Sequence, residues 1–192
     1  MRASFPAVGA SLLVVLALLL VGGCGAQQPS VSAPTPAQAR SELAGSPAAL
    51  ASLHAQAATL LDGGMSAYRA RIASLSGRPV VVNAWASWCP PCRSEMPYFS
   101  RAAVRYGRRV AFLGVNAGDT DGDARTFLGR HYVPYPSYVD HHDQIADEIG
   151  VTAGLPTTVF YGRDGKVAFV HQGQYRDEAA LVTDLKRYAG AS

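Results

Sequence analysis

The chain has 192 residues, of which 48% are hydrophobic and 16% are charged. That length allows one domain of ordinary size beside shorter segments. The formal net charge is only +3, and the basic cluster Arg101, Arg105, Arg108 and Arg109 falls on one predicted helix and its end. A charge this small and scattered argues against a nucleic-acid-binding protein.

The N-terminal segment has the pattern of a signal peptide, which we expect to cover residues 1–23. Residues 8–21 are almost wholly apolar, a run too short to cross a bilayer comfortably. The run ends in Leu-Val-Gly-Gly-Cys at residues 20–24, which resembles a bacterial lipobox. The resemblance implies that Cys24 is lipidated and holds the protein on the extracytoplasmic face of the cell membrane. An uncleaved anchor, or cleavage elsewhere with Cys24 left free, are the alternatives.

The segment after the signal peptide is expected to be a flexible tether over residues 24–45. It is rich in Gln, Ser, Pro and Ala and has no hydrophobic periodicity. The folded domain is expected over residues 46–192. It should open with a helix that Ser46 caps and that continues to residue 62, followed by a shorter helix over residues 68–75.

The most informative stretch is a buried strand that runs into a pair of cysteines. Val80, Val81 and Val82 are consecutive β-branched residues, as in a central strand covered on both faces. Two prolines separate Cys89 from Cys92, and proline fits the first turn of a helix. Cys89 should therefore lie at a helix N-terminus, where a thiolate is favoured over a thiol. Cys92, one turn inside, can resolve a mixed disulfide formed at Cys89.

Two other interpretations of the cysteine pair concern its structural use. A Cys-x-x-Cys pair is half of a zinc site, but zinc needs about four ligands. The sequence has no second cysteine pair, and His141 and His142 are adjacent rather than spaced as ligands. We therefore predict neither a metal site nor a cofactor. A purely structural disulfide stays open, although two prolines and flanking tryptophans are an unusual setting for one.

The remaining pattern alternates helices and strands and then ends in a hairpin and a helix. Helices are expected over 93–106, 121–132, 143–149 and 176–188, and strands over 110–115, 137–140, 157–161 and 166–171. Gly162 to Gly165 is a hairpin turn signal. This order predicts an α/β protein with a mixed sheet.

The cysteine segment also carries a family resemblance. Trp-Ala-Ser-Trp-Cys-Pro-Pro-Cys-Arg-Ser-Glu-Met-Pro, at residues 85–97, is similar to the TlpA/ResA/CcmG-like exported branch of the thioredoxin superfamily. Further matches are residues 150–158 and 164–167, and the resemblance covers roughly residues 71–189. It implies a thioredoxin-like three-layer α/β/α sandwich with a mixed central sheet and a C-terminal β-hairpin plus helix.

The resemblance assigns roles to individual residues. Cys89 would be the attacking, partly exposed thiolate, and Cys92 the buried resolving thiol. The peptide bond before Pro156 would be cis, shaping a groove for the substrate backbone. The residues expected to contact the substrate are Trp88, Pro90, Leu155 and Pro156.

Glu95 is expected to handle a proton for the cysteine pair. Thioredoxins have a buried Asp on the central strand, but Asn83 stands at that position and cannot exchange a proton. The exported branch has a Glu three residues after the second Cys, where this chain has Glu95, and Cys92 and Glu95 lie on neighbouring parts of one helix face. Burial would raise the pKa of Glu95. The alternative is a solvated Glu that stabilises the helix dipole.

The resemblance implies a thiol–disulfide oxidoreductase outside the cytoplasmic membrane that reduces disulfides of exported proteins. Apocytochrome c is a candidate partner, and a membrane thiol-reductant transporter would supply electrons. The alternatives are the reverse reaction, oxidation of thiols in exported proteins; a peroxiredoxin-like peroxidase; and a non-catalytic binding module. The peroxidase is disfavoured because the residues before Cys89 do not form the Pro-x-x-x-Thr-x-x-Cys pattern.

Overall fold

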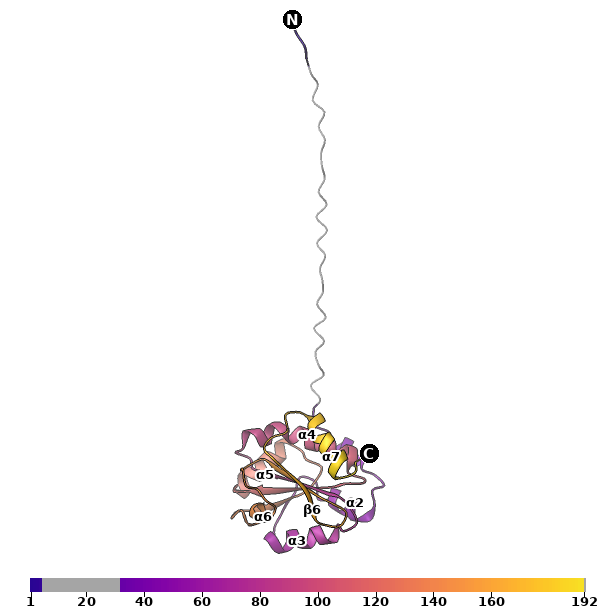
Figure 1. Ribbon diagram of the computed structural model, residues 1–192, viewed down its shortest axis with the longest axis vertical. Helices are drawn as coiled ribbons and strands as arrows, with labels where there is room; N and C mark the ends of the chain where they lie inside the picture. The colour runs from indigo at the N-terminus through magenta and orange to yellow at the C-terminus, as the bar shows by residue number, and fades with distance from the viewer. Residues whose placement is uncertain (5–31, 192) are drawn as a thin grey trace. The chain divides into compact units, whose positions relative to one another are not determined.

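A computed structural model describes residues 1–4 and 32–191 (Figure 1). The chain divides into two units, residues 1–31 and 32–192. Of the first unit, residues 1–4 are described, and they form neither helix nor strand. The apolar run, the lipobox and Cys24 lie outside the described residues. None of the helices in the described part of the chain is both long and apolar enough to cross a membrane.

The second unit is built on a mixed sheet whose spatial strand order is β1-β4-β3-β2-β5-β6. The strands are β1 (Leu60–Leu61), β2 (Val80–Trp85), β3 (Ala111–Ala117), β4 (Ser137–Asp140), β5 (Thr157–Tyr161) and β6 (Val167–Gln172). The central strand β2 pairs in parallel with β3 and antiparallel with β5. Every residue of β2 and β3 is buried, as the consecutive apolar residues predicted.

Helices cover both faces of this sheet (Figure 1). They are α1 (Pro36–Glu42), α2 (Ala48–His54), α3 (Gly64–Ser74), α4 (Pro90–Tyr106), α5 (Asp121–Arg130), α6 (Gln144–Glu148) and α7 (Glu178–Tyr188). One core joins the sheet to α4, α5 and α7, and a second core joins it to α2, α3 and α6. The predicted three-layer α/β/α sandwich is confirmed.

The expected tether over residues 24–45 is wrong in its second half. Helix α1 lies inside that range, and Ala39 on it is fully buried. Thr35 and Gln38 form a capping box, in which each side chain accepts a hydrogen bond from the other residue's backbone N–H. This local signal starts a helix in a segment that composition alone marks as flexible. The folded part therefore begins before residue 46.

The first helix of the expected domain is also shorter than predicted. Helix α2 ends at His54, and Leu60 pairs with Ser137 as part of the edge strand β1. Ser46 does not cap α2; its hydroxyl donates to the carbonyl of Leu43 instead. The leucines continue at helical spacing past residue 54. There, however, hydrogen bonding to β4 outweighs the local helix propensity, and Leu60 and Leu61 form a strand.

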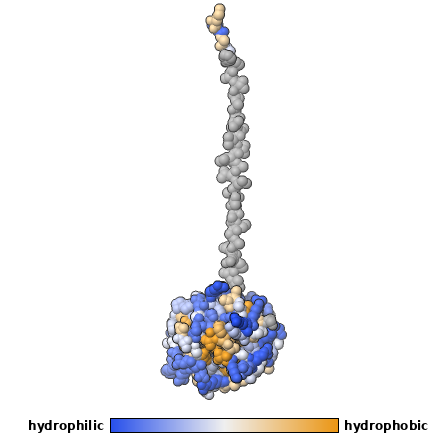
Figure 2. All heavy atoms as spheres, in the orientation of Figure 1, coloured by the Kyte–Doolittle hydropathy of each residue, from blue (hydrophilic) through white to orange (hydrophobic). Residues whose placement is uncertain are grey.

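The C-terminal hairpin of β5 and β6 has the predicted turn. The N–H of Gly162 donates to the carbonyl of Lys166, and Gly165 has a positive φ of 74° that suits glycine. Strand β6 is at the edge of the sheet, and its Val167 is 50% exposed. Figure 2 shows hydrophobic residues gathered near the middle of the face on which Figure 1 draws β6.

Candidate active site

The cysteine pair lies where β2 ends and α4 begins. Cys89 is the N-cap of α4, the two prolines occupy its first turn, and the Cys89 Sγ accepts the N–H of Cys92 at 3.3 Å. The two cysteines form a disulfide. Cys89 is 2% exposed and Cys92 1% exposed. Both cysteines are thus almost inaccessible in this oxidised state, and the expected contrast between an exposed first thiol and a buried second one, which concerns the reduced pair, stays a prediction.

A cis-proline lies at the same end of the sheet as the disulfide. The Leu155–Pro156 peptide bond is cis, as the family resemblance implies. Ala84 pairs with Thr157 across β2 and β5, so Pro156 comes level with the end of β2 from which the Cys89 loop departs. Pro156 is buried and Leu155 half-buried.

The surface beside the disulfide is apolar and exposed. Trp88 is 59% exposed, and its indole Nε1–H donates to the carbonyl of Gly118 at 2.9 Å. Pro90 is exposed on the other side of Cys89 in the sequence. The four residues expected to contact a substrate thus differ: Trp88 and Pro90 are exposed, whereas Leu155 is half-buried and Pro156 is buried.

Glu95 is a fully buried residue of α4, so the interpretation of a solvated first-turn carboxylate is wrong. Its Oε1 accepts from Asn83 Nδ2 at 2.9 Å, and its Oε2 accepts from the backbone N–H of Tyr175 at 3.0 Å. Burial raises the pKa of Glu95 to about 7, against the lowering effect of these two hydrogen bonds. The carboxyl group can therefore gain or lose a proton near neutrality.

The contact of Tyr175 with Glu95 was not predicted from the sequence. The Tyr175 ring stacks on His171 with ring centroids 3.9 Å apart, and its hydroxyl donates to Asp184 at 2.9 Å. These contacts fix the backbone N–H that holds Glu95. Because Tyr175 is eighty residues from Glu95 in the chain, only the return of the C-terminal segment over α4 brings the two together.

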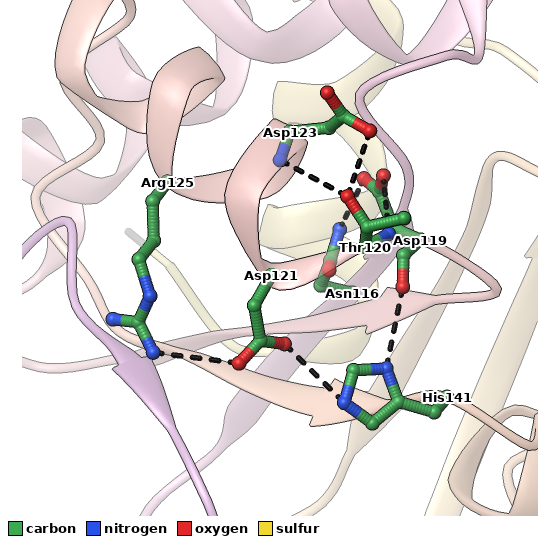
Figure 3. Close-up of polar contacts among 7 residues, drawn as sticks. All are labelled: Asn116, Asp119, Thr120, Asp121, Asp123, Arg125 and His141. Carbon is green, nitrogen blue, oxygen red and sulfur yellow. Dashed lines mark hydrogen bonds and ion pairs between the residues drawn. The ribbon is translucent and has the colours of Figure 1, made fainter.

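Asp119 is a second buried carboxylate, and sequence reasoning missed it (Figure 3). Its Oδ2 accepts from the N–H of Ser87 at 2.6 Å and from Asn116 Nδ2 at 2.9 Å. Its Oδ1 accepts from the hydroxyl of Ser87 at 2.9 Å and from the N–H of Thr120 at 3.0 Å. Asp119 thus ties the loop after β3 to the loop before Cys89. The parallel pairing of Trp85 with Asn116 brings the ends of β2 and β3 together. The feature of the sequence that could have pointed to this carboxylate is an Asp shortly after the predicted strand.

His141 joins the same loop from the side of β4 (Figure 3). Its Nδ1 lies 3.3 Å from the backbone oxygen of Asp119, and its Nε2 lies 3.3 Å from Asp121 Oδ1. Asp121 also lies 3.5 Å from Arg125. Among the residues that the structure describes, no three His, Cys, Asp or Glu side chains are placed together to hold a metal ion.

A disulfide at a helix N-terminus, level with a cis-proline on a mixed sheet, defines a thioredoxin-like protein. Residues 51–186 match the Redoxin family model. The chain belongs to the Redoxin family, in the ResA- and DsbE-like branch of the thioredoxin superfamily that its cysteine motif predicted.

Curated relatives carry the name thiol-disulfide oxidoreductase ResA. The protein from Geobacillus thermodenitrificans is 33% identical over 119 residues, which is 62% of this chain and 65% of that protein. The one from Bacillus subtilis is 31% identical over 106 residues, which is 55% of this chain and 59% of that protein. The matches thus span less than two thirds of these relatives.

Solved structures share the fold. A Chlorobium tepidum structure, assigned as a thiol:disulfide interchange protein DsbE, is 30% identical with a TM-score of 0.58 and covers 62% of this chain and 85% of its own. A secreted Mycobacterium tuberculosis disulfide oxidoreductase homologous to E. coli DsbE is 26% identical with a TM-score of 0.54, and the match covers 60% of this chain and 85% of that one.

Proposed function

We propose that this protein is a thiol–disulfide oxidoreductase that acts outside the cytoplasmic membrane and reduces disulfides of exported proteins. The observation that carries this proposal is the Cys89–Cys92 disulfide, with Cys89 as the N-cap of α4 beside the cis Leu155–Pro156 bond. The names of the ResA relatives support it. In the working state both cysteines begin as thiols.

The first step is an attack by Cys89. The N-terminus of α4 offers unpaired N–H groups and the positive end of the helix dipole, which favour the thiolate of Cys89. Its Sγ forms a bond to one sulfur of the substrate disulfide. The other substrate sulfur leaves with the electron pair of the broken bond and takes a proton from water.

The second step needs Cys92 to lose its proton, and Glu95 is the group that we assign to accept it. The Cys92 thiolate attacks Cys89 Sγ, and the remaining substrate sulfur leaves and receives that proton. Two electrons have then passed from the protein to the substrate, and Glu95 is ionised again. A pKa of about 7 suits a group that accepts and returns a proton near neutral pH. Asn83 and Tyr175 hold the carboxyl group in place.

Membrane attachment is part of the proposal and concerns residues outside the described ones. Residues 1–23 would be removed as a signal peptide, and lipidated Cys24 would anchor the protein on the outer face of the cytoplasmic membrane. Thiol-containing exported proteins, apocytochrome c among them, would be partners, and a membrane thiol-reductant transporter would reduce the disulfide. Replacing Cys24→Ser should move the protein from the membrane fraction to the soluble exported fraction.

Trapping tests the chemistry directly. In Cys92→Ser the mixed disulfide at Cys89 cannot be resolved, so partner proteins should be captured in covalent complexes. Dithiothreitol should separate these complexes by reducing the mixed disulfide. The double variant Cys89→Ser/Cys92→Ser is the control and should capture none. Equal capture by both variants would contradict the proposal. For the direction of electron flow, rapid acid quenching and alkylation in cells should find the wild-type pair mostly as thiols; a pair found mostly as a disulfide would reverse the assignment to thiol oxidation.

A further inference from the structure

A charged groove opens beside the cysteine pair, between the first turns of α4 and one face of α5. We call it the α4–α5 groove. Its volume is about 380 Å³, and the residues that line it include Ser87, Arg93, Asp123, Phe127, Arg130 and His131. The α5 residues recur every three to four positions, so they share one helix face. Phe127 is buried and forms the floor, where His131 stacks on it with ring centroids 4.4 Å apart.

The groove carries two unused guanidinium groups. Arg93 and Arg130 are exposed, and neither guanidinium group forms a hydrogen bond or an ion pair with any residue that the structure describes. The acidic side chain in the groove, Asp123, accepts a hydrogen bond from the hydroxyl of Thr120 at 2.7 Å. A guanidinium presents paired donors that match a carboxylate. The groove is therefore suited to a carboxylate from another molecule.

The groove lies on one side of the disulfide only. Ser87 comes two residues before Cys89, and Arg93 directly follows Cys92. The cis-proline loop leads into β5, which pairs with β2 on the edge opposite to β3. Residues 151–155 of that loop contain no charged side chain. A substrate chain that crosses the disulfide therefore meets the two guanidinium groups on the α5 side and no charged residue of 151–155 on the other side.

We propose that the α4–α5 groove binds an Asp or Glu side chain that lies within a few residues of the disulfide cysteine in the protein substrate. This inference rests on the proposed function and narrows its substrate class to disulfides with an acidic neighbour. Two exposed ion pairs of this kind should favour an acidic over a basic substrate by about five- to tenfold in rate constant.

Three peptide disulfides of one sequence test the preference, with Glu, Gln or Lys at the two positions beside the cysteine. The fully reduced protein is mixed with each peptide at low ionic strength, and the single-turnover rate constant is measured. We expect Glu to react faster than Gln and Gln faster than Lys, with the spread collapsing in 0.5 M salt, at roughly a 4 Å screening length. Equal rate constants for the three peptides would overturn the inference.

Two double variants locate the effect. Arg93→Gln/Arg130→Gln removes both guanidinium groups of the groove, and Arg105→Gln/Arg109→Gln removes two exposed cations at the far end of α4. The net charge changes equally. We expect the Glu-to-Lys rate ratio to fall to about one in the groove variant and to persist in the far variant. Arg130→Glu should invert it.

The outcomes separate this inference from the proposed function. A ratio that falls equally in both double variants would overturn the groove and assign the preference to net charge. Because the ratio compares two peptides in one variant, any effect of Arg93 on the acidity of the thiols cancels. Failure of the wild-type protein to reduce the Gln peptide would instead contradict the proposed function itself.

Discussion

Two buried carboxylates flank the cysteine pair, and the structure uses them differently. Glu95 lies on α4, three residues after Cys92, and accepts two hydrogen bonds, from Asn83 and from Tyr175. Asp119 lies beside the preceding loop and accepts four, two of them from Ser87. Asp119 is 9% exposed and Glu95 0%.

This contrast distinguishes a buried carboxylate that holds loops together from one that can exchange a proton. Four donors bind Asp119 and tie it to two loops, which suits a structural role. On Glu95 the cost of burial outweighs two hydrogen bonds, and its pKa rises to about 7. The number of donors, rather than burial alone, separates the two groups, and exchanging each acid for its amide tests this.

The largest effect is expected from Asp119→Asn. The amide replaces one acceptor oxygen by an NH2 group, so two of the four donors lose their partner. An unmatched buried donor costs about 1–3 kcal/mol, and we expect the free energy of unfolding to fall by about 4 kcal/mol. Urea denaturation of the oxidised protein at pH 7 measures it.

Asp121→Asn is the matched control for that change. Asp121 lies two residues after Asp119, at the start of α5, but its side chain is 40% exposed and its contact with Arg125 is 3.5 Å long. An exposed pair contributes about 0–1 kcal/mol, so this variant should unfold almost like the wild type. If both variants lost the same free energy of unfolding, any amide in this segment would be destabilising. The four hydrogen bonds of Asp119 would then not explain its effect, and the comparison with Glu95 would fail.

The next effect is expected from Glu95→Gln, and it depends on pH. The folded pKa of about 7 lies above the ordinary value of 4.5, so the folded state binds this proton more tightly than the unfolded chain. The stability of the wild type therefore falls as pH rises from 4.5 through 7, and the Gln variant lacks this loss. Between pH 4 and pH 8 the variant should gain about 3 kcal/mol on the wild type.

A second measurement on Glu95→Gln concerns the reduced protein. In the wild type we expect the rate of alkylation of Cys89 by iodoacetamide to show an inflection near pH 7 from the carboxyl group, and Glu95→Gln should lose it. An unchanged alkylation profile would remove Glu95 from the mechanism, even if the stability difference were found. The stability measurement reports on burial alone, and the alkylation profile reports on coupling to the thiols.

Most of the fold was predictable, because buried strands and amphipathic helices leave strong local patterns. The Val80–Val82 run and the two prolines after Cys89 predicted β2, the start of α4 and the position of the cysteine pair. The errors came where a non-local pairing decided the structure. Leu60 and Leu61 continue a helical spacing, yet they pair with β4.

The site was predictable only as far as its residues are close in sequence. Glu95 follows Cys92 by one helical turn, so its placement under α4 could be argued from spacing. Its pKa is raised by burial, and the two donors that partly oppose this rise are Asn83 and the distant Tyr175. The contacts of Asp119 also come from residues distant in the sequence, because they depend on the parallel pairing of β2 with β3. A single sequence does not contain these pairings, so both sets of donors had to be read from the structure.

The smallest effect is expected from Trp88→Phe, and it decides what holds the loop before Cys89. Besides Asp119, the described contact between this loop and the segment after β3 is the hydrogen bond from Trp88 Nε1 to the Gly118 carbonyl. The ring is 59% exposed, so the change removes one accessible hydrogen bond, about 0.5–1 kcal/mol of unfolding free energy in urea denaturation. A loss as large as that of Asp119→Asn would mean that the indole holds the loop. Asp119 would then accept its hydrogen bonds without holding the loop in place. The number of hydrogen-bond donors would no longer explain why Asp119 has a structural role and Glu95 a role in proton transfer.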